Sequence, residues 1–436
     1  MKYRRVNVKN ISKSTIIAVL CLVAVTGLFT RLLKIRAAGV IGCVMFLAAL
    51  LPFILKYLDK AKCEKRRFGD TCLYIEQLLY AFQNREKLID ALEETWSVLP
   101  DKSRIKELIS DATDHILYDY RDEAVIENGL KLIEKEYDSA RVRSAHRFIT
   151  SMEQLGGNPA SGVAILQKDR AVWQKQTAAF QEKCKSWLRN TVIAMLVTLV
   201  MCSFTPAVIS LNIPDMSIWN SPVYQVSSAV IIIAFIALYT VLLKKTSVSW
   251  IGDKKSLGYE EALRLHKRVT GEKHDLGRKV ALRRLKKEII KSFSDWFIAV
   301  SIELQSNNVR VAIQNSYDKA PDTIKPALAD LIDDLSIAPE EAWPYKKFLN
   351  EYEIPEVSAA MGMLFAISNG NGHDSNVQLE EILNRNTEIT ATSEELYNED
   401  RLGGLYGLFL LPALIGAGKM LTDMTLILFY FLGMSF

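Results

Sequence analysis

The sequence has few of the motifs that mark an enzyme or a metalloprotein. Its six cysteines form no CxxC pair and no zinc spacing, and its five histidines show neither HExxH nor a paired arrangement. It has no GxSxG motif. Acidic pairs such as Glu93-Glu94 and Asp333-Asp334 are typical of solvated helix faces. We therefore expect reduced thiols, no catalytic, cofactor-binding or metal-binding residues, and no enzyme activity.

One stretch resembles a phosphate-binding loop only superficially. A Walker A motif ending at Gly418-Lys419 needs glycine at position 413 and serine or threonine at position 420, where the chain has alanine and methionine. The stretch also lies in an apolar run. We exclude nucleotide binding there.

Charges are scarce in three apolar blocks, at the N-terminus, the centre and the C-terminus of the 436 residues. The central block predicts two spans, Thr191–Leu211 and Val226–Leu243, because each approaches the roughly 20 residues that cross a bilayer. The loop between them lacks lysine and arginine, whereas basic residues flank both outer ends. The positive-inside rule places those ends in the cytoplasm and the loop outside.

The other two blocks predict further spans. Ser14–Thr30 and Ala37–Leu55 read as a hairpin with a cytoplasmic N-terminus, because no signal-peptide cleavage site closes the first run. Leu405–Gly418 and Met424–Phe436 are split by a stretch holding Lys419 and Asp423, which suggests a hairpin or one span plus a surface segment. We favour about six spans in total. Asp423 is expected at an interface, and the lack of other charges in the spans argues against transport.

Two polar segments separate the blocks, Phe68–Lys185 and Phe293–Arg401, and both predict packed amphipathic helices without strands. In the first, we expect a turn at Gln83-Asn84, a break at Pro100-Asp101 with Asp101 as the next cap, and a break at Gly156–Pro159. The helix after Pro159 should run into the membrane at Trp187. The fold class is thus an all-α polytopic membrane protein.

A basic stretch, Asp253–Lys291, mixes cationic and apolar residues at helical spacing. We favour an amphipathic helix on anionic lipid at the inner leaflet. An acidic face of a partner is the alternative. Nucleic acid is not expected as a partner, because aromatic residues do not interleave the basic ones and the net charge is only +4.

Ordered landmarks recur in the two polar segments, which predicts a duplicated unit. Ala91-Leu92 and Pro100-Asp101 match Ala312-Ile313 and Pro321-Asp322 without a gap. The other matches are Phe68 with Phe293, Gly156-Gly157-Asn158 with Gly370-Asn371-Gly372, and Pro206 with Pro412. Both span prolines more often mark kinks than hinges, and Gly403 with Gly407 form a GxxxG that favours close helix packing.

The resulting organisation has six parts: an N-terminal transmembrane hairpin (1–56), a first cytoplasmic helical domain (57–186), a central transmembrane hairpin (187–245), a basic linker helix (246–292), a second cytoplasmic helical domain (293–402) and a C-terminal transmembrane segment (403–436).

This layout of an Ala-Leu helix, a Pro-Asp break, a Gly-Gly-Asn turn and a polar helix entering the membrane resembles the type II secretion system F domain. Two such domains in tandem look most like TadB and TadC proteins of tight-adherence (Tad) pili joined in one chain. Members often carry glycine in the first helical turn, where this chain has Gln83-Asn84 and Asn307-Asn308. Asparagine can also adopt left-handed geometry.

The resemblance implies a non-catalytic platform protein in the bacterial inner (plasma) membrane, with the N-terminus and both large domains in the cytoplasm. Its implied partners are membrane lipid, a cytoplasmic secretion ATPase and pilin or pseudopilin subunits, and a homo-oligomer stays open. The alternatives are a duplicated transporter or channel subunit and a membrane-anchored scaffold.

Overall fold

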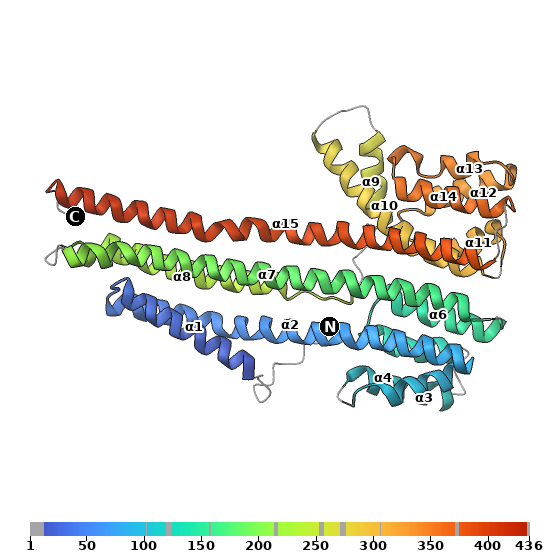
Figure 1. Cartoon of the computed structure of the whole chain (residues 1–436), viewed down its shortest axis with the longest axis horizontal. Helices are drawn as coiled ribbons and strands as arrows, with labels where there is room; N and C mark the ends of the chain where they lie inside the picture. The colour runs from blue at the N-terminus through green and yellow to red at the C-terminus, as the bar shows by residue number, and fades with distance from the viewer. Residues whose placement is uncertain are drawn as a thin grey trace. The chain divides into compact units, whose positions relative to one another are not determined.

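The computed structural model describes residues 13–101, 103–118, 124–156, 158–212, 217–252, 257–270, 276–305, 307–370 and 375–433. Secondary structure in these ranges is helical throughout, without a strand (Figure 1). The predicted all-α fold is confirmed. The basic residues Lys2, Arg4, Arg5 and Lys9, and also Gly157, Asn371 and Gly372 of the predicted repeat, lie outside the described ranges.

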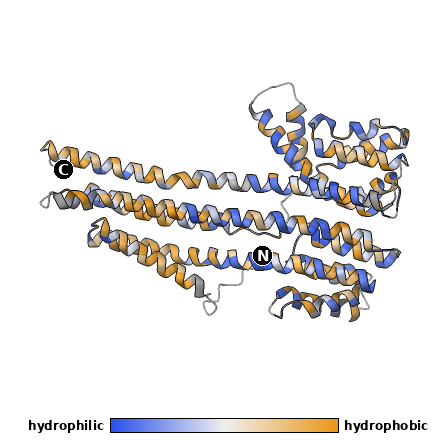
Figure 2. Cartoon of the chain, in the orientation of Figure 1, coloured by the Kyte–Doolittle hydropathy of each residue, from blue (hydrophilic) through white to orange (hydrophobic). Residues whose placement is uncertain are grey.

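The chain divides into two units, which we treat separately. The span unit comprises Met1–Arg66, Phe180–Ser249 and Asp400–Phe436. The bundle unit comprises Arg67–Ala179 and Trp250–Glu399. Figure 2 shows mostly hydrophobic residues along the helices of the span unit and mixed colouring in the helices of the bundle unit.

Five helices supply the span unit: α1 (Lys13–Leu32), the first part of α2 (Ala37–Arg85), the second part of α7 (Ala160–Asn212), α8 (Pro222–Thr246) and the end of α15 (Ser375–Phe431). Of these, α2, α7, α8 and α15 are long and apolar enough to cross a membrane, and α1 has a shorter apolar run. The short helix η2 (Ser217–Asn220) precedes α8. These features are those of an integral membrane protein.

The C-terminal block is one helix. α15 continues through Lys419 and Asp423 to Phe431, so the break predicted there is wrong, and the count of six spans is not confirmed. The physical reason is the spacing of the two charges. Four residues apart on a helix, Lys419 and Asp423 form an ion pair along one face, and neither has to leave the helix to find a partner. Pro206 and Pro412 likewise lie inside α7 and α15.

The bundle unit contains two groups of short helices. The first group has α3 (Leu88–Val98), α4 (Arg104–Tyr118), α5 (Val125–Glu136) and α6 (Ala140–Leu155), which pack with parts of α2 and α7 around Leu78, Leu92 and Ile149. The second group has α9 (Tyr259–Thr270), α10 (Leu276–Glu303), α11 (Val309–Ser316), α12 (Lys325–Ile337), α13 (Trp343–Lys347), η3 (Asn350–Tyr352) and α14 (Pro355–Ser368). Its core includes Phe293, Trp296 and Met361.

The ends of the short helices differ in detail from the sequence-based expectation. α2 continues past Gln83-Asn84, and the left-handed residue is Glu86 (φ 56°), whose N–H donates to the Phe82 carbonyl at 2.8 Å. Asn308 is extended (φ −69°) and caps α11, accepting from the Val311 N–H at 3.0 Å. The prediction that asparagine takes the left-handed conformation at these two turns is therefore wrong. At the first turn the left-handed residue is Glu86, and at the second Asn308 caps the start of α11 with its side chain.

Asp101 does not cap the next helix. α4 begins at Arg104, and the Asp101 carboxylate instead accepts from Lys106 Nζ at 2.7 Å. The break at Gly156 is confirmed. Gly156 has φ 72° at the end of α6 and donates its N–H to the Met152 carbonyl at 2.8 Å. Only glycine takes this φ without strain, which is why the helix stops there.

The basic stretch 253–291 is part of the second group. It holds α9 and the start of α10, and its apolar residues Val269, Leu285 and Ile289 are buried in the core that contains Trp296. The expected lipid-facing helix stays a prediction, because protein covers these three side chains whereas Leu263 and Val280 of the same stretch are exposed. The expected boundary at residues 292 and 293 also falls inside α10.

Candidate functional site

A buried ion network joins the two groups of the bundle unit. Its members are Arg141 on α6, Asp169 on α7, and Thr390 and Glu394 on α15, and we call it the Arg141 network. Arg141 Nε lies 2.8 Å from Asp169 Oδ2, and Arg141 Nη1 lies 3.4 Å from Glu394 Oε1. The Asp169 side chain is 3% exposed. A carboxylate so deeply buried needs a paired cation, and Arg141 supplies it.

Hydroxyl groups extend this network to α10. The Thr390 hydroxyl donates to Asp169 Oδ1 at 3.1 Å and lies 3.2 Å from Ser294 Oγ. The Arg141 guanidinium carbon also lies 4.9 Å from the centre of the Trp173 ring, a cation–π distance. Burial alone would lower the pKa of Arg141, but Asp169 and Glu394 raise it above its ordinary value. The guanidinium therefore stays charged and fixes α6, α7, α10 and α15 at one place.

A second buried network lies inside the first group. The Tyr74 hydroxyl is 2.7 Å from His146 Nε2, and His146 Nδ1 is 2.8 Å from Glu134 Oε1. Burial raises the pKa of Tyr74. For Glu134, burial acts to raise the pKa, but the hydrogen bond and charge of His146 outweigh it and lower the pKa. With a neutral tyrosine at its inner end, the network holds α2, α5 and α6 together.

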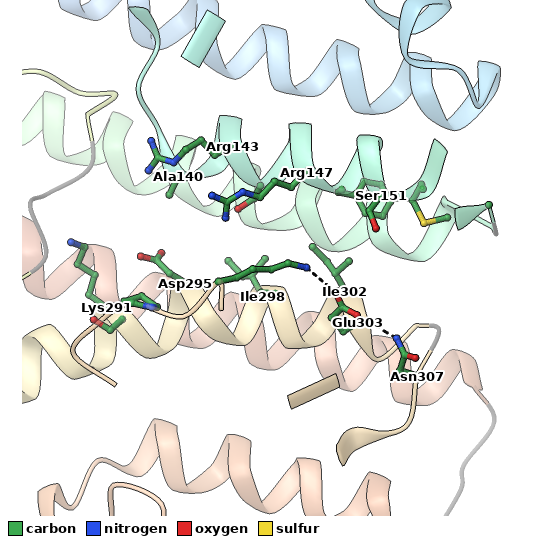
Figure 3. A pocket seen from close by; sticks show the side chains of 18 residues that line it. Ala140, Arg143, Arg147, Ser151, Lys291, Asp295, Ile298, Ile302, Glu303 and Asn307 are labelled. Atoms are coloured by element: carbon green, nitrogen blue, oxygen red, sulfur yellow. Dashed lines mark hydrogen bonds and ion pairs between the residues drawn. The ribbon is translucent and has the colours of Figure 1, made fainter. Parts of the chain in front are cut away.

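A groove of about 550 Å³ runs between α6 and α10 within the bundle unit (Figure 3). Arg143, Arg147 and Ser151 line the α6 side, and Lys291, Asp295 and Glu303 line the α10 side. Arg147 extends from α6 toward α10 (Figure 3). The carboxylate of Glu303 is already used, because it accepts from Lys319 Nζ at 2.9 Å and from the amides of Asn307 and Asn315.

The span unit contains a buried ion pair between Lys419 and Asp423, whose side chains are 2% and 1% exposed. Lys419 Nζ lies 3.9 Å from the centre of the Tyr224 ring, and the Tyr224 hydroxyl donates to the Leu33 carbonyl at 3.1 Å. Asp423 therefore packs inside the protein, whereas the sequence suggested an interface. The spacing of four residues between opposite charges in an apolar run was the pattern that could have predicted this pair.

The close approach of spans occurs at a different glycine from the predicted ones. An added Cβ at Gly403 or Gly407 would meet no atom within 4 Å, so the predicted role of this GxxxG in packing the described helices is wrong. At Gly416, an added Cβ would overlap Thr198 Cγ2 on α7. The Gly416 carbonyl also accepts from Cys202 Sγ at 3.8 Å. Ala413 to Met420 lie in the middle of α15, so no loop precedes Lys419 to cradle a phosphate.

Comparison with family models, with curated proteins and with solved structures finds no match for this chain.

The sequence could not have revealed the two networks in the bundle unit. His146 lies 72 positions from Tyr74, and Arg141 lies 253 positions from Glu394. No local motif connects residues so far apart.

Proposed function

We propose that the chain is a non-catalytic platform protein of a type IV pilus, Tad or type II secretion-like machine in a bacterial plasma membrane. It couples a cytoplasmic secretion ATPase to the assembly of pilin or pseudopilin subunits. The observation that carries the proposal is that α2, α7 and α15 each continue from the bundle unit into the span unit without a break.

Continuous helices suit a protein that transmits motion. A helix with its backbone hydrogen bonds intact resists bending far more than a loop does. A partner that displaces the short helices therefore acts on the spans through three unbroken helices. Pro206 and Pro412 lie in the membrane parts of α7 and α15, where proline permits local bending.

The second support is the matching order of helices in the two groups, which favours the predicted duplication. α2, α3, α4, α5, α6 and α7 follow one another as α10, α11, α12, α13, α14 and α15 do. The buried faces also match at a constant offset within each pair of helices. Leu88, Ala91, Leu92 and Thr95 in α3 correspond to Val309, Ala312, Ile313 and Ser316 in α11. Val142, Ala145, His146 and Ile149 in α6 correspond to Val357, Ala360, Met361 and Leu364 in α14.

We propose five spans, formed by α1, α2, α7, α8 and α15, in place of six. The N-terminus and both helical groups lie in the cytoplasm, as the basic flanks of α2 and α8 require. With α15 unbroken, its end at Phe431 lies outside. Lipid covers the exposed apolar faces of these helices, and pilin helices contact the spans that carry Pro206 and Pro412.

The buried Lys419–Asp423 pair favours a second candidate, a transporter or channel subunit, because ionisable groups within membrane helices commonly mark ion pathways. Two facts weigh against it. The two charges neutralise each other within α15. The described spans between their basic flanks hold no further aspartate, glutamate, histidine, lysine or arginine that could continue a pathway. A membrane-anchored scaffold without a secretion role is the third candidate.

Deleting the gene in its own cell tests the platform role. The proposal predicts that filaments or secreted products disappear while the pilins accumulate in the plasma membrane and the ATPase keeps its activity. Restoring the full chain should restore assembly. Normal filament assembly without the chain, or genes for no secretion ATPase and no prepilin-like proteins in the genome, would rule the proposal out.

A further inference from the structure

The groove between α6 and α10 has the size and the chemistry of a small-molecule site. Its volume of about 550 Å³ falls in the range of roughly 300–1,000 Å³ that ligand pockets occupy. The first helical group forms one wall and the second group forms the other. A molecule bound there would contact both groups at once.

Ser292, beside this groove, has a buried hydroxyl without a hydrogen-bond partner. Its side chain lines the groove and is 1% exposed, yet its hydroxyl has no hydrogen-bond partner. Buried hydroxyls in proteins are nearly always bonded, because leaving one unpaired is costly. The hydroxyl oxygen is shielded from the groove, so a ligand with a hydrogen-bond acceptor becomes its partner only when the Ser292 side chain rotates toward the groove.

The hydrogen-bonding groups around the groove indicate what kind of ligand fits. The cationic donors are the guanidinium groups of Arg143 and Arg147 and the ammonium groups of Lys291 and Lys319. Lys291 Nζ lies 3.9 Å from Glu288 Oε1, and Lys319 bonds Glu303. Arg143 pairs with Asp138, which does not line the groove. Arg147 is exposed and makes no hydrogen bond or ion pair with a described residue, although its charge acts on Glu134.

Cationic side chains outnumber carboxylates in the lining, because only Asp295 and Glu303 carry negative charge. Glu303 is held by Lys319, Asn307 and Asn315, and Asp295 lies in the field of the buried Arg141. A groove with more cations than carboxylates favours an anionic ligand, such as one with phosphate groups.

The rest of the lining is apolar. Phe148 and Met152 on α6 face the groove together with Ile298 and Ile302 on α10. These side chains cannot bond to phosphate, but they suit a flat aromatic ring. The ligand should therefore combine an aromatic group with an anionic one.

We propose that this groove binds a nucleotide, with its phosphates near Arg143, Arg147, Lys291 and Ser292 and its base against the four apolar side chains. The nucleotide bridges α6 and α10 and so stabilises the present arrangement of the two helical groups. The inference stands on the groove alone and does not depend on the proposed platform role. It concerns a different place from Gly416–Met420, which is helical.

Calorimetric titration of the full chain in detergent with magnesium-free ATP tests the inference. Saturable binding with a dissociation constant of about 1 mM or tighter is expected. Arg147→Gln should weaken it by roughly tenfold or more, because it removes a charged donor, and Ser292→Ala should also weaken it. The control is Arg385→Gln, which removes an exposed arginine paired with Glu388 away from the groove, and it should bind ATP as the parent does.

Four results would overturn the inference. They are no saturable binding up to about 10 mM ATP, equal affinities for Arg147→Gln and Arg385→Gln, adenosine binding as tightly as ATP, and binding of an acidic helical peptide in place of ATP. Arg147 is exposed, so its substitution should leave the fold intact. Thermal unfolding of both variants without ligand checks this point.

Discussion

Arg141 lies among carboxylates that come from two different helices. Replacing it would leave Asp169 buried with only the Thr390 hydroxyl as a partner. We predict that Arg141→Ala lowers the free energy of unfolding of the chain by about 3–5 kcal/mol, as for other broken buried pairs. Denaturant unfolding followed by circular dichroism measures this.

Arg104 provides the control for Arg141. It also pairs with glutamates, Glu107 and Glu136, but its side chain is 52% exposed. Arg104→Ala should change the free energy of unfolding by about 1 kcal/mol or less, because water screens exposed pairs. Equal losses for the two substitutions would show that the Arg141 network does not hold the helices together.

His146 gives a prediction that depends on pH. His146 lowers the pKa of Glu134 in the folded state. The resulting stabilisation is complete above the ordinary glutamate pKa of about 4.3 and is lost as the pH falls through the lower folded value. His146→Met, which places the residue found at the matching position Met361, should flatten this loss of stability between about pH 5 and pH 3. Unfolding curves across that range measure it, and an unchanged pH profile would contradict the assignment.

At the residue scale, sequence reasoning succeeds where a residue acts on its neighbours in the chain. Gly156 stops α6 because its own backbone takes φ 72°. Prediction from the sequence fails where the partner is distant in the chain, as for Arg141 with Glu394. It also fails where two local roles compete, as for Asp101, which pairs with Lys106 instead of capping α4. The energies of such alternatives are too close for a sequence pattern to rank.

At the scale of the helices, two glycines of α15 make a matched pair. Gly416 faces Thr198 with no room for a Cβ, whereas Gly407 faces open space. Gly416→Ala should destabilise the packing of α15 on α7 by about 1–3 kcal/mol, as overpacked sites do. Gly407→Ala should be neutral or slightly stabilising. Unfolding in detergent compares the two variants, and a larger loss for Gly407→Ala would contradict this packing.

The end of α15 tests the number of spans. A reporter that is active only outside the plasma membrane should be active when fused after Phe431, and inactive when fused after Ser249. A reporter active only in the cytoplasm should show the reverse. If the fusion after Phe431 behaves as cytoplasmic, the last block crosses the membrane twice and five spans are too few.

The helices themselves were largely predictable, because periodic apolar positions and long apolar runs determine them. The surface that buries each helix and the points where helices end were not predictable. The basic stretch around Leu285 was expected on lipid, since its periodicity shows that one face is buried but not which surface buries it. Lys419 and Asp423 were read as a break, because two charges in an apolar run are costly unless they meet each other.

At the scale of the whole molecule, the platform account requires a cytoplasmic motor that binds the helical groups. The account assigns no chemistry to the chain itself, so the ATPase must provide all of the energy. The unbroken helices α2, α7 and α15 are what make such a connection effective.

The most direct test is whether the full chain, purified in detergent or lipid nanodiscs, binds the secretion ATPase encoded in the same genome. The account predicts a saturable complex that survives co-purification and that weakens when Arg141→Ala disturbs the joint between the two groups, but not when Arg104→Ala alters the exposed surface. No binding of the ATPase to the intact chain in either lipid or detergent would contradict the account.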